Sequence, residues 1–206
     1  CCKHFPGHGD TSTDSHTGLP LINKSYEELK KQELLPFSIA VNSGTDMIMT
    51  AHLQYPKLDD TTYYSPIAGE EVVLPATMSK KILTGILKED FGFEGVIVTD
   101  AMNMGAIEKY FGLNEATIKS IEAGADIVLM SVNPICADDR KKLDSLFSDI
   151  KSALADGRIS EERLNDAVTR VVRLKIDKGI IGKDYDFDPD DAAEKAKTIV
   201  GCPEHR

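Results

Sequence analysis

Long apolar stretches are missing from this sequence of 206 residues. No run reaches the roughly 18 apolar residues that a transmembrane helix needs, so we expect no membrane span in this chain. Positive charge is also scarce, because 24 Lys and Arg residues stand against 34 Asp and Glu residues, which gives a formal net charge of -10. Since phosphate backbones repel an acidic protein, nucleic acid is not an expected partner.

Cysteine is rare as well, and the four cysteines do not have the spacing of a zinc site. Cys1 and Cys2 are adjacent in an apolar context, which favours small buried side chains. The chain begins at Cys1 without a methionine or a signal-peptide pattern, and we expect it to be part of a longer polypeptide. The localisation stays open between the bacterial cytoplasm and a cell-wall or extracellular site.

Four short apolar runs alternate with helical patterns, at residues 1–5, 46–52, 95–100 and 125–130. The runs do not alternate between polar and apolar residues, so they indicate strands that are buried on both faces, as in a parallel sheet. Repeated strand–helix units predict an α/β fold with right-handed connections and outer helices.

The amphipathic segments between and after these runs are predicted helices, at residues 26–41, 79–90, 115–123, 139–155 and 160–178. Ser25 and Ser79 are expected N-caps, and Pro36 is expected to break the first helix. Residues 54–75 contain three prolines and little periodicity, which predicts a long loop.

The segment with the most chemistry follows the first run and reads KHFPGHGDTSTDSH, residues 3–16. Polar side chains at the carboxyl ends of parallel strands point into the active site of barrel and open-sheet enzymes. The proline and glycines fit a tight, fixed loop. The alternative interpretation is a solvated loop with incidental polar residues.

Two further polar residues end predicted strands. Asp100 ends the third run, where an unpaired buried carboxylate would be costly; the alternative interpretation is an N-cap for the segment that follows. His52 ends the second run, and a hydrogen-bonded structural histidine is as good an interpretation of it as a catalytic one. Three strands thus bring Lys3, His4, His52 and Asp100 to one edge of the sheet.

A carboxylate and a histidine–aspartate pair at one edge suit a double displacement. The carboxylate attacks an electrophilic carbon, and the histidine protonates the leaving group and later activates water. A zinc site is the main competing interpretation, since four histidines and two aspartates lie in or near the loop. The usual zinc spacings are absent, so we expect no metal.

Three motifs resemble glycoside hydrolase family 3, in its β-N-acetylhexosaminidase branch. They are KHFPGHG with the later DSH (residues 3–9 and 14–16), PATMS (residues 75–79) and GFEGVIVTDAMNM (residues 92–104). The resemblance extends from Lys3 to Arg206, and its motifs are long and specific.

This resemblance implies a TIM-type (β/α)₈ barrel, and it assigns roles to individual residues. Asp100 is the implied nucleophile, which forms a glycosyl–enzyme ester, and His16 is the implied acid/base with Asp14 as its partner. Lys3 and His4 match a pair that binds sugar hydroxyls, while His52 and Met102 are expected in the wall of the site. No cofactor is implied.

The chain is too short for such a barrel, which needs about 250 residues. Its four runs match the second half, about four βα units, so we expect an N-terminal half-barrel of the same polypeptide as partner. We therefore predict a partial barrel in residues 1–183 and a connection towards a second domain in residues 184–206. The 206 residues alone are expected to be inactive.

The predicted function is removal of terminal β-linked N-acetylglucosamine from oligosaccharides derived from peptidoglycan or chitin, a step of cell-wall recycling. Two alternatives stay open: a β-N-acetylglucosaminide phosphorylase, in which phosphate replaces water, and an inactive sugar-binding fragment. The intact Asp14, His16 and Asp100 argue against the second.

Overall fold

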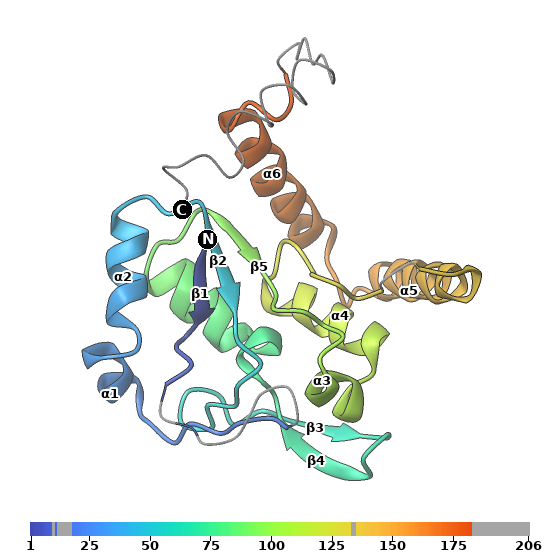
Figure 1. The fold of residues 1–206 in the computed structure, drawn as a ribbon, viewed down its shortest axis with the longest axis horizontal. Helices are drawn as coiled ribbons and strands as arrows, with labels where there is room; N and C mark the ends of the chain where they lie inside the picture. Colours follow the sequence, from blue (N-terminus) through green and yellow to red (C-terminus); the bar gives the residue numbers. More distant parts are fainter. Residues whose placement is uncertain (10, 12–17, 133–134, 183–206) are drawn as a thin grey trace, which may run out of the picture. The chain divides into compact units, whose positions relative to one another are not determined.

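The computed structural model describes residues 1–9, 11, 18–132 and 135–182. Contacts divide the chain into two compact units, Cys1–Leu174 and Lys175–Arg206. The first unit contains a parallel sheet of three strands, which Figure 1 shows side by side in the order β1 (Cys2–Phe5), β2 (Met47–Thr50) and β5 (Val96–Val98). These strands confirm three of the four predicted runs and the parallel α/β class.

The fourth predicted strand is reduced to one parallel bridge between Val98 and Ile127. Residues 125–130 do run beside β5, because Ile127 accepts a hydrogen bond from the Thr99 N–H at 3.0 Å. However, the Leu129 N–H donates to the Thr99 side-chain hydroxyl at 2.9 Å instead of a carbonyl. The side chain takes the place of a backbone partner, so the ladder ends and the prediction of a full strand is wrong.

The first predicted helix is two helices, α1 (Tyr26–Lys31) and α2 (Leu35–Asn42). Ser25 caps α1 as expected, in a capping box with Glu28. The break precedes Pro36, which lies in the first turn of α2. Proline is tolerated there because its missing N–H would have no partner within the helix. The predicted break at Pro36 was therefore placed too late.

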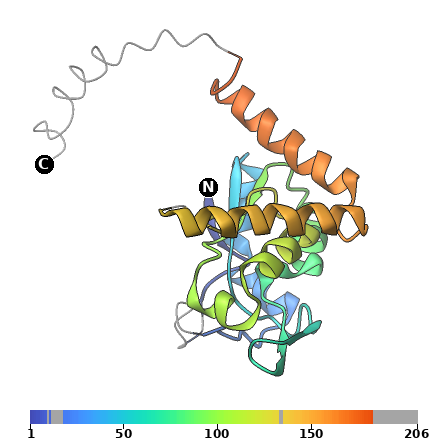
Figure 2. The same ribbon diagram turned by 90° about the vertical axis from the view of Figure 1, so that its right-hand side faces the viewer.

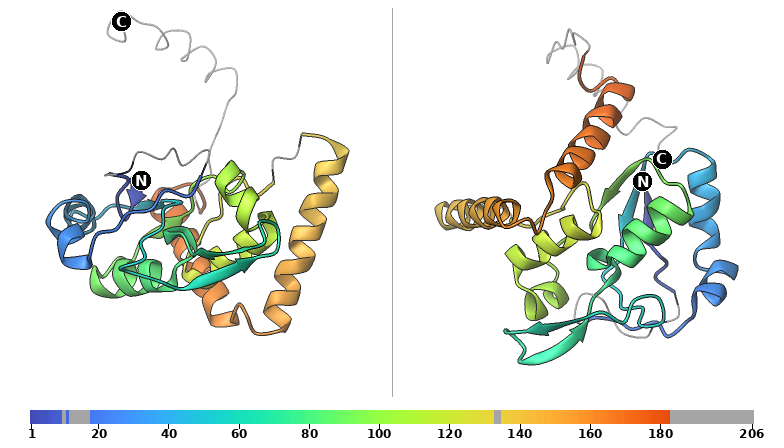
Figure 3. Two further views of the ribbon diagram at one scale, coloured as in Figure 1. Left: turned by 90° about the horizontal axis from the view of Figure 1, so that it is seen from below. Right: turned by 180° about the vertical axis from the view of Figure 1, so that it is seen from behind.

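The predicted helices after residue 78 are confirmed by η2 (Lys81–Asp90), which has π-type hydrogen bonding, α4 (Leu113–Ala123), α5 (Ala137–Ala155) and α6 (Glu161–Asp177). A short helix that the sequence did not predict, α3 (Gly105–Tyr110), follows the turn of Asp100. Ser79 caps η2, since its hydroxyl accepts from the Ile82 N–H at 3.2 Å. Figure 2 and the right panel of Figure 3 show α3, α4 and α5 on the side of the sheet beyond β5, away from α1 and α2. None of the described helices is long and apolar enough to cross a membrane.

The segment predicted as a long loop contains an antiparallel hairpin, β3 (Thr62–Ser65) and β4 (Glu70–Val73), followed by the short helix η1 (Ala76–Met78). Figure 1 shows the hairpin at the end of the sheet to which the strand arrows of β1 and β2 point. Tyr63 stacks on Phe111 at 5.3 Å, and the Ser65 hydroxyl donates to the Tyr110 carbonyl at 2.5 Å. The hairpin therefore supports the segment that follows Asp100.

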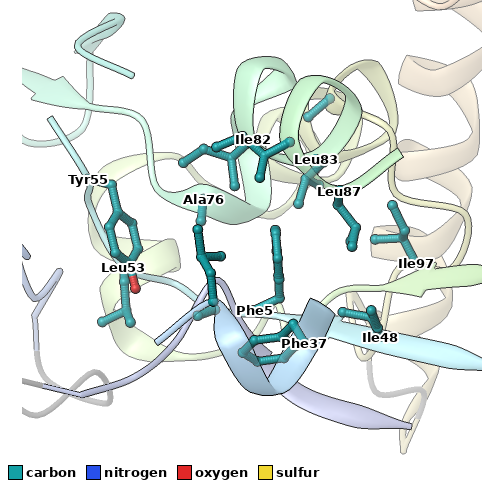
Figure 4. Close-up of a cluster of buried hydrophobic side chains, with 14 of the residues drawn as sticks. Phe5, Phe37, Ile48, Leu53, Tyr55, Ala76, Ile82, Leu83, Leu87 and Ile97 are labelled. Carbon is teal, nitrogen blue, oxygen red and sulfur yellow. The ribbon is translucent and has the colours of Figure 1, made fainter. Parts of the chain in front are cut away.

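The main core lies between the sheet and its helices. Figure 4 shows side chains from β1, α2, β2, η2 and β5 pointing toward one another, among them Phe5, Phe37, Ile48, Leu83, Leu87 and Ile97. Phe5 and Phe37 meet edge to face at 5.2 Å. Full burial of each such side chain contributes about 1.5–3 kcal/mol, so this layer fixes where the strand ends lie.

The amino-terminal end of the sheet carries a buried ionic cluster. Asp126, whose side chain is 0% exposed, forms ion pairs with Arg163 and with Lys88, the latter at 3.5 Å. Its second oxygen accepts from the Ile97 N–H at 2.9 Å. Asp166 pairs with both cations at 2.5 and 3.1 Å. The cluster thus joins η2, β5 and α6 at the end of the sheet opposite Asp100.

The two amino-terminal cysteines differ from the prediction of buried small side chains. Cys1 is exposed and Cys2 only half-buried. Cys2 lies in β1, and among the described residues this strand pairs with β2 alone. One edge of β1 therefore lacks a neighbouring strand that would bury Cys2.

Candidate active site

The candidate site lies at the carboxyl ends of the three parallel strands. Lys3 and His4 lie in β1, His52 follows β2, and Asp100 follows β5. The His4 Nε2 lies 3.6 Å from the Asp100 Oδ2, and both side chains are about a quarter exposed, at 28% and 24%. The structure thus brings His4, His52 and Asp100 to the same end of the sheet, and Lys3 precedes His4 in β1.

The Asp100 carboxylate is held by the turn it starts. Its Oδ1 accepts from the Ala101 N–H at 2.8 Å. The next N–H, of Met102, donates to the Leu129 carbonyl at 2.9 Å. One carboxylate oxygen is therefore fixed by the backbone, while the other is turned towards His4.

The surroundings of His4 lower its pKa and so favour the neutral imidazole. Burial lowers its pKa most, the nearby Asp100 charge opposes this, and Lys3 and His8 lower the pKa further. The His8 ring lies edge-on to the His4 ring, with 6.0 Å between centroids. A neutral His4 has one N–H to donate to Asp100 or to a ligand hydroxyl.

His52 is almost completely buried, at 1% exposure. Its Nδ1 lies 2.9 Å from the Thr77 hydroxyl, and its Nε2 lies 3.1 Å from the Ala101 carbonyl. Burial lowers the pKa of His52, against the opposing effects of the Ala101 carbonyl and the Asp100 charge. Of the two interpretations, the hydrogen-bonded structural histidine fits this environment, and His52 does not present a free nitrogen to a substrate.

Met102 lies below the site rather than in its exposed wall. Its side chain is completely buried in a second apolar cluster between the hairpin and α3, together with Val72, Ile107 and Phe111. A thioether in this cluster contacts apolar atoms and supports the turn of Asp100 from beneath.

A pocket of about 470 Å³ opens beside Lys3 and His4. It is lined by Cys2, Lys3, His4, Gly7, His8, Gly9, Glu33, Pro36 and Phe37. Volumes of 300–1,000 Å³ are typical of pockets for small ligands. Apart from Glu33, the charged or ionisable lining side chains come from β1 and the loop after it, and they include Lys3 and His4, which the family resemblance assigns to sugar binding.

Glu33 is a lining residue that the sequence did not indicate. Glu33 packs directly against the loop after β1. A Cβ atom at Gly7, whose φ is +132°, would lie only 2.6 Å from the Glu33 Cβ, so this contact requires glycine. The Glu33 carboxylate is 7% exposed and pairs with Lys24. Its Oε2 is buried and accepts no hydrogen bond from the described part of the chain. Glu33 lies between α1 and α2 within a predicted helical segment, so the sequence gives no reason to expect a buried glutamate there.

Asp14 and His16 lie outside the described residues. Within the described ranges, no group of three or more His, Cys, Asp or Glu side chains is arranged to hold a metal ion. The described site therefore offers a partly exposed carboxylate beside an imidazole, and that imidazole lines a pocket together with Lys3.

Comparisons with known proteins identify the family of this chain. Residues 1–174 match the family "Glycosyl hydrolase family 3 N terminal domain". Beta-hexosaminidase A of Pseudoalteromonas piscicida is 41% identical over 174 residues, which cover 84% of this chain and 29% of that protein.

Two solved structures are similar in fold and sequence. One is a glycoside hydrolase family 3 beta-N-acetylglucosaminidase from Paenibacillus sp. str. FPU-7, with a TM-score of 0.74 and 36% identity, covering 91% of this chain and 32% of that one. The other is the beta-glucoside phosphorylase BglX bound to 2FGlc, with a TM-score of 0.76 and 28% identity, covering 94% and 33%. The chain thus spans about a third of the length of these relatives.

Proposed function

Because this chain belongs to glycoside hydrolase family 3, we propose that it carries the catalytic groups of a retaining β-N-acetylhexosaminidase. The observation that carries the proposal is the 3.6 Å approach of His4 to Asp100 at the carboxyl ends of the strands. His4 also lines the pocket beside β1, together with Lys3. The names of the hexosaminidase and N-acetylglucosaminidase relatives support the substrate class.

In the proposed reaction, a terminal β-linked N-acetylglucosamine lies over Lys3 and His4, which bind its hydroxyls. The Asp100 carboxylate attacks the anomeric carbon, and the bond to the leaving oxygen breaks as His16 protonates that oxygen. Water then loses a proton to His16 and attacks the same carbon, which releases the sugar and the free carboxylate. Asp14 keeps the His16 imidazole in the tautomer that each step needs.

His16→Ala is expected to affect substrates according to their leaving groups. Hydrolysis of an alkyl or sugar glycoside should fall by about 10²-fold or more, because its leaving oxygen needs a proton. Hydrolysis of a dinitrophenyl glycoside should show a smaller loss in the glycosylation step, because that leaving group departs as an anion. The measurement is kcat/KM across a series of leaving groups. An equal loss for all of them would contradict the acid role of His16.

We propose that residues 1–183 form the second half of a (β/α)₈ barrel, with residues 184–206 as a connection, and that upstream chain supplies the first half. Within the described residues β1 pairs with β2 alone, and this supports the proposal, since exposed edges of parallel strands are normally covered. So does α6, whose Leu164, Val168 and Val172 recur every four residues and are 37%, 52% and 39% exposed.

The 206 residues alone are expected to show no hydrolysis of an aryl β-N-acetylglucosaminide, whereas the complete polypeptide that contains them should be active. Half a barrel exposes core side chains and lacks the sugar contacts of the other half. The measurement is the rate of aryl release by both purified proteins. Substantial hydrolysis by the 206-residue chain would contradict the half-barrel proposal.

A phosphorylase is the second candidate function, and the similarity to BglX, a beta-glucoside phosphorylase, favours it. There phosphate would attack the Asp100 ester in place of water and give a sugar 1-phosphate. A histidine acid/base repels incoming phosphate less than a carboxylate would. Product analysis with and without phosphate separates the two: free sugar under both conditions supports the hydrolase.

A further inference from the structure

A row of buried hydroxyl groups leads from β2 to the ring of His52. The Thr50 hydroxyl lies 2.8 Å from the Thr77 hydroxyl, which lies 2.9 Å from the His52 Nδ1. Thr50 and Thr77 are both fully buried. Thr77 belongs to η1, the short helix after the hairpin, so the row joins two elements that the sequence separates by 25 residues.

The direction of these hydrogen bonds follows from counting protons. The Ala101 carbonyl can only accept, so the His52 Nε2, 3.1 Å away, carries a proton. A neutral imidazole has a single N–H, which leaves Nδ1 as an acceptor. The Thr77 hydroxyl therefore donates its one proton to Nδ1 and accepts from Thr50. It also lies 3.0 Å from the Ala51 carbonyl, but it cannot serve both acceptors at once.

The neutral state of His52 is supported by its surroundings. Burial lowers its pKa most strongly, and His4 lowers it further, against the effects of the Ala101 carbonyl and the Asp100 charge. In the imidazolium form Nδ1 would also carry a proton. It would donate that proton to the Thr77 hydroxyl, and Thr77 would then donate to the Ala51 carbonyl. Thr77 thus accepts or donates according to the charge of the ring, and the neutral ring selects donation.

The other end of the row holds the Asp100 turn. The Ala101 carbonyl accepts the Nε2–H of His52 at 3.1 Å, and the Ala101 N–H, in the preceding peptide group, donates to the Asp100 Oδ1 at 2.8 Å. On the far side, the Met102 N–H is bound by the Leu129 carbonyl at 2.9 Å. His52 and Leu129 therefore bind the two polar groups of the Ala101–Met102 peptide, and this fixes Ala101, whose N–H holds the Asp100 carboxylate.

We propose that Thr77 is a positioning residue, whose hydroxyl keeps His52 in the Nε2–H tautomer and thereby holds the Ala101 peptide and the Asp100 carboxylate in place for attack. The inference rests on the proposed function, since it assumes that Asp100 is the nucleophile. Thr77 touches neither substrate nor reacting atoms and acts only through His52. Loss of its hydroxyl leaves Nδ1 buried without a donor. The alternative tautomer would place an Nε2 lone pair against the Ala101 carbonyl.

The test compares Thr77→Val and Thr77→Ser in the complete polypeptide, with an aryl β-N-acetylglucosaminide as substrate. A misplacement of about 1 Å at a reacting group can cost about 10²-fold. We expect Thr77→Val to lower kcat by 10- to 100-fold with KM within about threefold, since the sugar contacts of Lys3 and His4 are unchanged. Thr77→Ser keeps the hydroxyl and should stay within about threefold of the wild-type kcat.

Thr117→Val is the matched control, because Thr117 is also buried and its hydroxyl pairs with the Ser131 hydroxyl at 2.9 Å without contact to His52. It should lower the melting temperature about as much as Thr77→Val while kcat stays near wild type. The inference is overturned if Thr77→Val keeps wild-type kcat, if KM alone changes, or if Thr117→Val loses as much kcat.

The ¹⁵N chemical shifts of the His52 ring test the inference without a variant. The wild-type protein should show a protonated Nε2 and an unprotonated Nδ1 at neutral pH, and a protonated Nδ1 would overturn the assignment even if Thr77→Val does not fold. A failure of the proposed function looks different. In that case the wild-type protein does not cleave the glycoside, while the ring shifts still report the tautomer.

Discussion

Asp100→Asn is expected to lower kcat for an aryl β-N-acetylglucosaminide by about 10³-fold or more. The substitution keeps the size of the side chain and the oxygen that accepts from the Ala101 N–H at 2.8 Å. It removes the charged oxygen that lies 3.6 Å from His4 and is proposed to attack the anomeric carbon. An amide is a far weaker nucleophile, so the glycosyl–enzyme ester should not form. The measurement is kcat and KM in the complete polypeptide.

Asp90→Asn is the control for this loss. The Asp90 carboxylate ends η2 and accepts a hydrogen bond from the Tyr26 hydroxyl at 3.0 Å, with no part in the site. The Asp90→Asn protein should have the kcat of the wild type. Near wild-type kcat for Asp100→Asn, or an equal loss for Asp90→Asn, would contradict the nucleophile assignment.

Asp126→Ala is expected to lower the free energy of unfolding by about 3–5 kcal/mol, because it breaks a buried ion pair and leaves its two cations with only the partly exposed Asp166 as an acidic partner. Asp126 is 0% exposed, and its partners Arg163 and Lys88 are only 14% and 12% exposed. Burial lowers the pKa of Lys88 most, and the Asp126 charge opposes this shift, as expected for a cation that depends on this carboxylate. The measurement is urea denaturation of the complete polypeptide, whose midpoint and slope give the free energy of unfolding.

Asp138→Asn is the control for this destabilisation. Asp138 also pairs with a lysine, at 2.9 Å from Lys141, but both side chains are about four-fifths exposed. Surface pairs of this kind contribute little, so its midpoint should stay at the wild-type value. Because Asp126 lies at the amino-terminal end of the sheet, kcat of the folded Asp126→Ala protein should be unchanged. A wild-type midpoint for Asp126→Ala would show that the cluster does not stabilise the fold.

The sequence predicted the elements that a hydrophobic period alone determines. Val96–Val98 is a run of β-branched residues without polar alternation, and it forms a strand that is buried on both faces. The helix η2 buries Ile82, Leu83, Ile86 and Leu87, the expected periodic positions. Ser25 and Glu28 form the capping box that their spacing allows. Such features depend on neighbours within a few residues.

Features that depend on distant partners were not predicted. The hairpin Thr62–Ser65 and Glu70–Val73 was not predicted, because its strands are short and the segment 54–75 contains three prolines. Most of its strand residues are β-branched, aromatic or charged, and Gly69, with φ of +74°, completes the turn between them. The fourth strand was overpredicted because a side chain, that of Thr99, takes the Leu129 N–H.

The residues of the candidate site also fall into those that the sequence indicated and those that only the structure shows. Lys3, His4 and Asp100 were predicted because charged groups at strand ends carry a chemical signal. Thr77 and Glu33 were not, because a threonine in η1 and a glutamate before α2 have ordinary local explanations. Their contacts with His52 and with the loop at Gly7 exist only in the folded chain.

The most direct test of the account is to trap the ester on Asp100. A fluorinated N-acetylglucosaminyl fluoride slows both steps of a retaining glycosidase but departs easily, so the intermediate accumulates. The complete polypeptide should gain the mass of one glycosyl group, and the modified peptide should contain Asp100 within GVIVTDAMNM. Asp100→Asn should gain no mass. A label on another carboxylate, or turnover of the reagent with no covalent intermediate in the wild type, would contradict the proposal that Asp100 is the nucleophile.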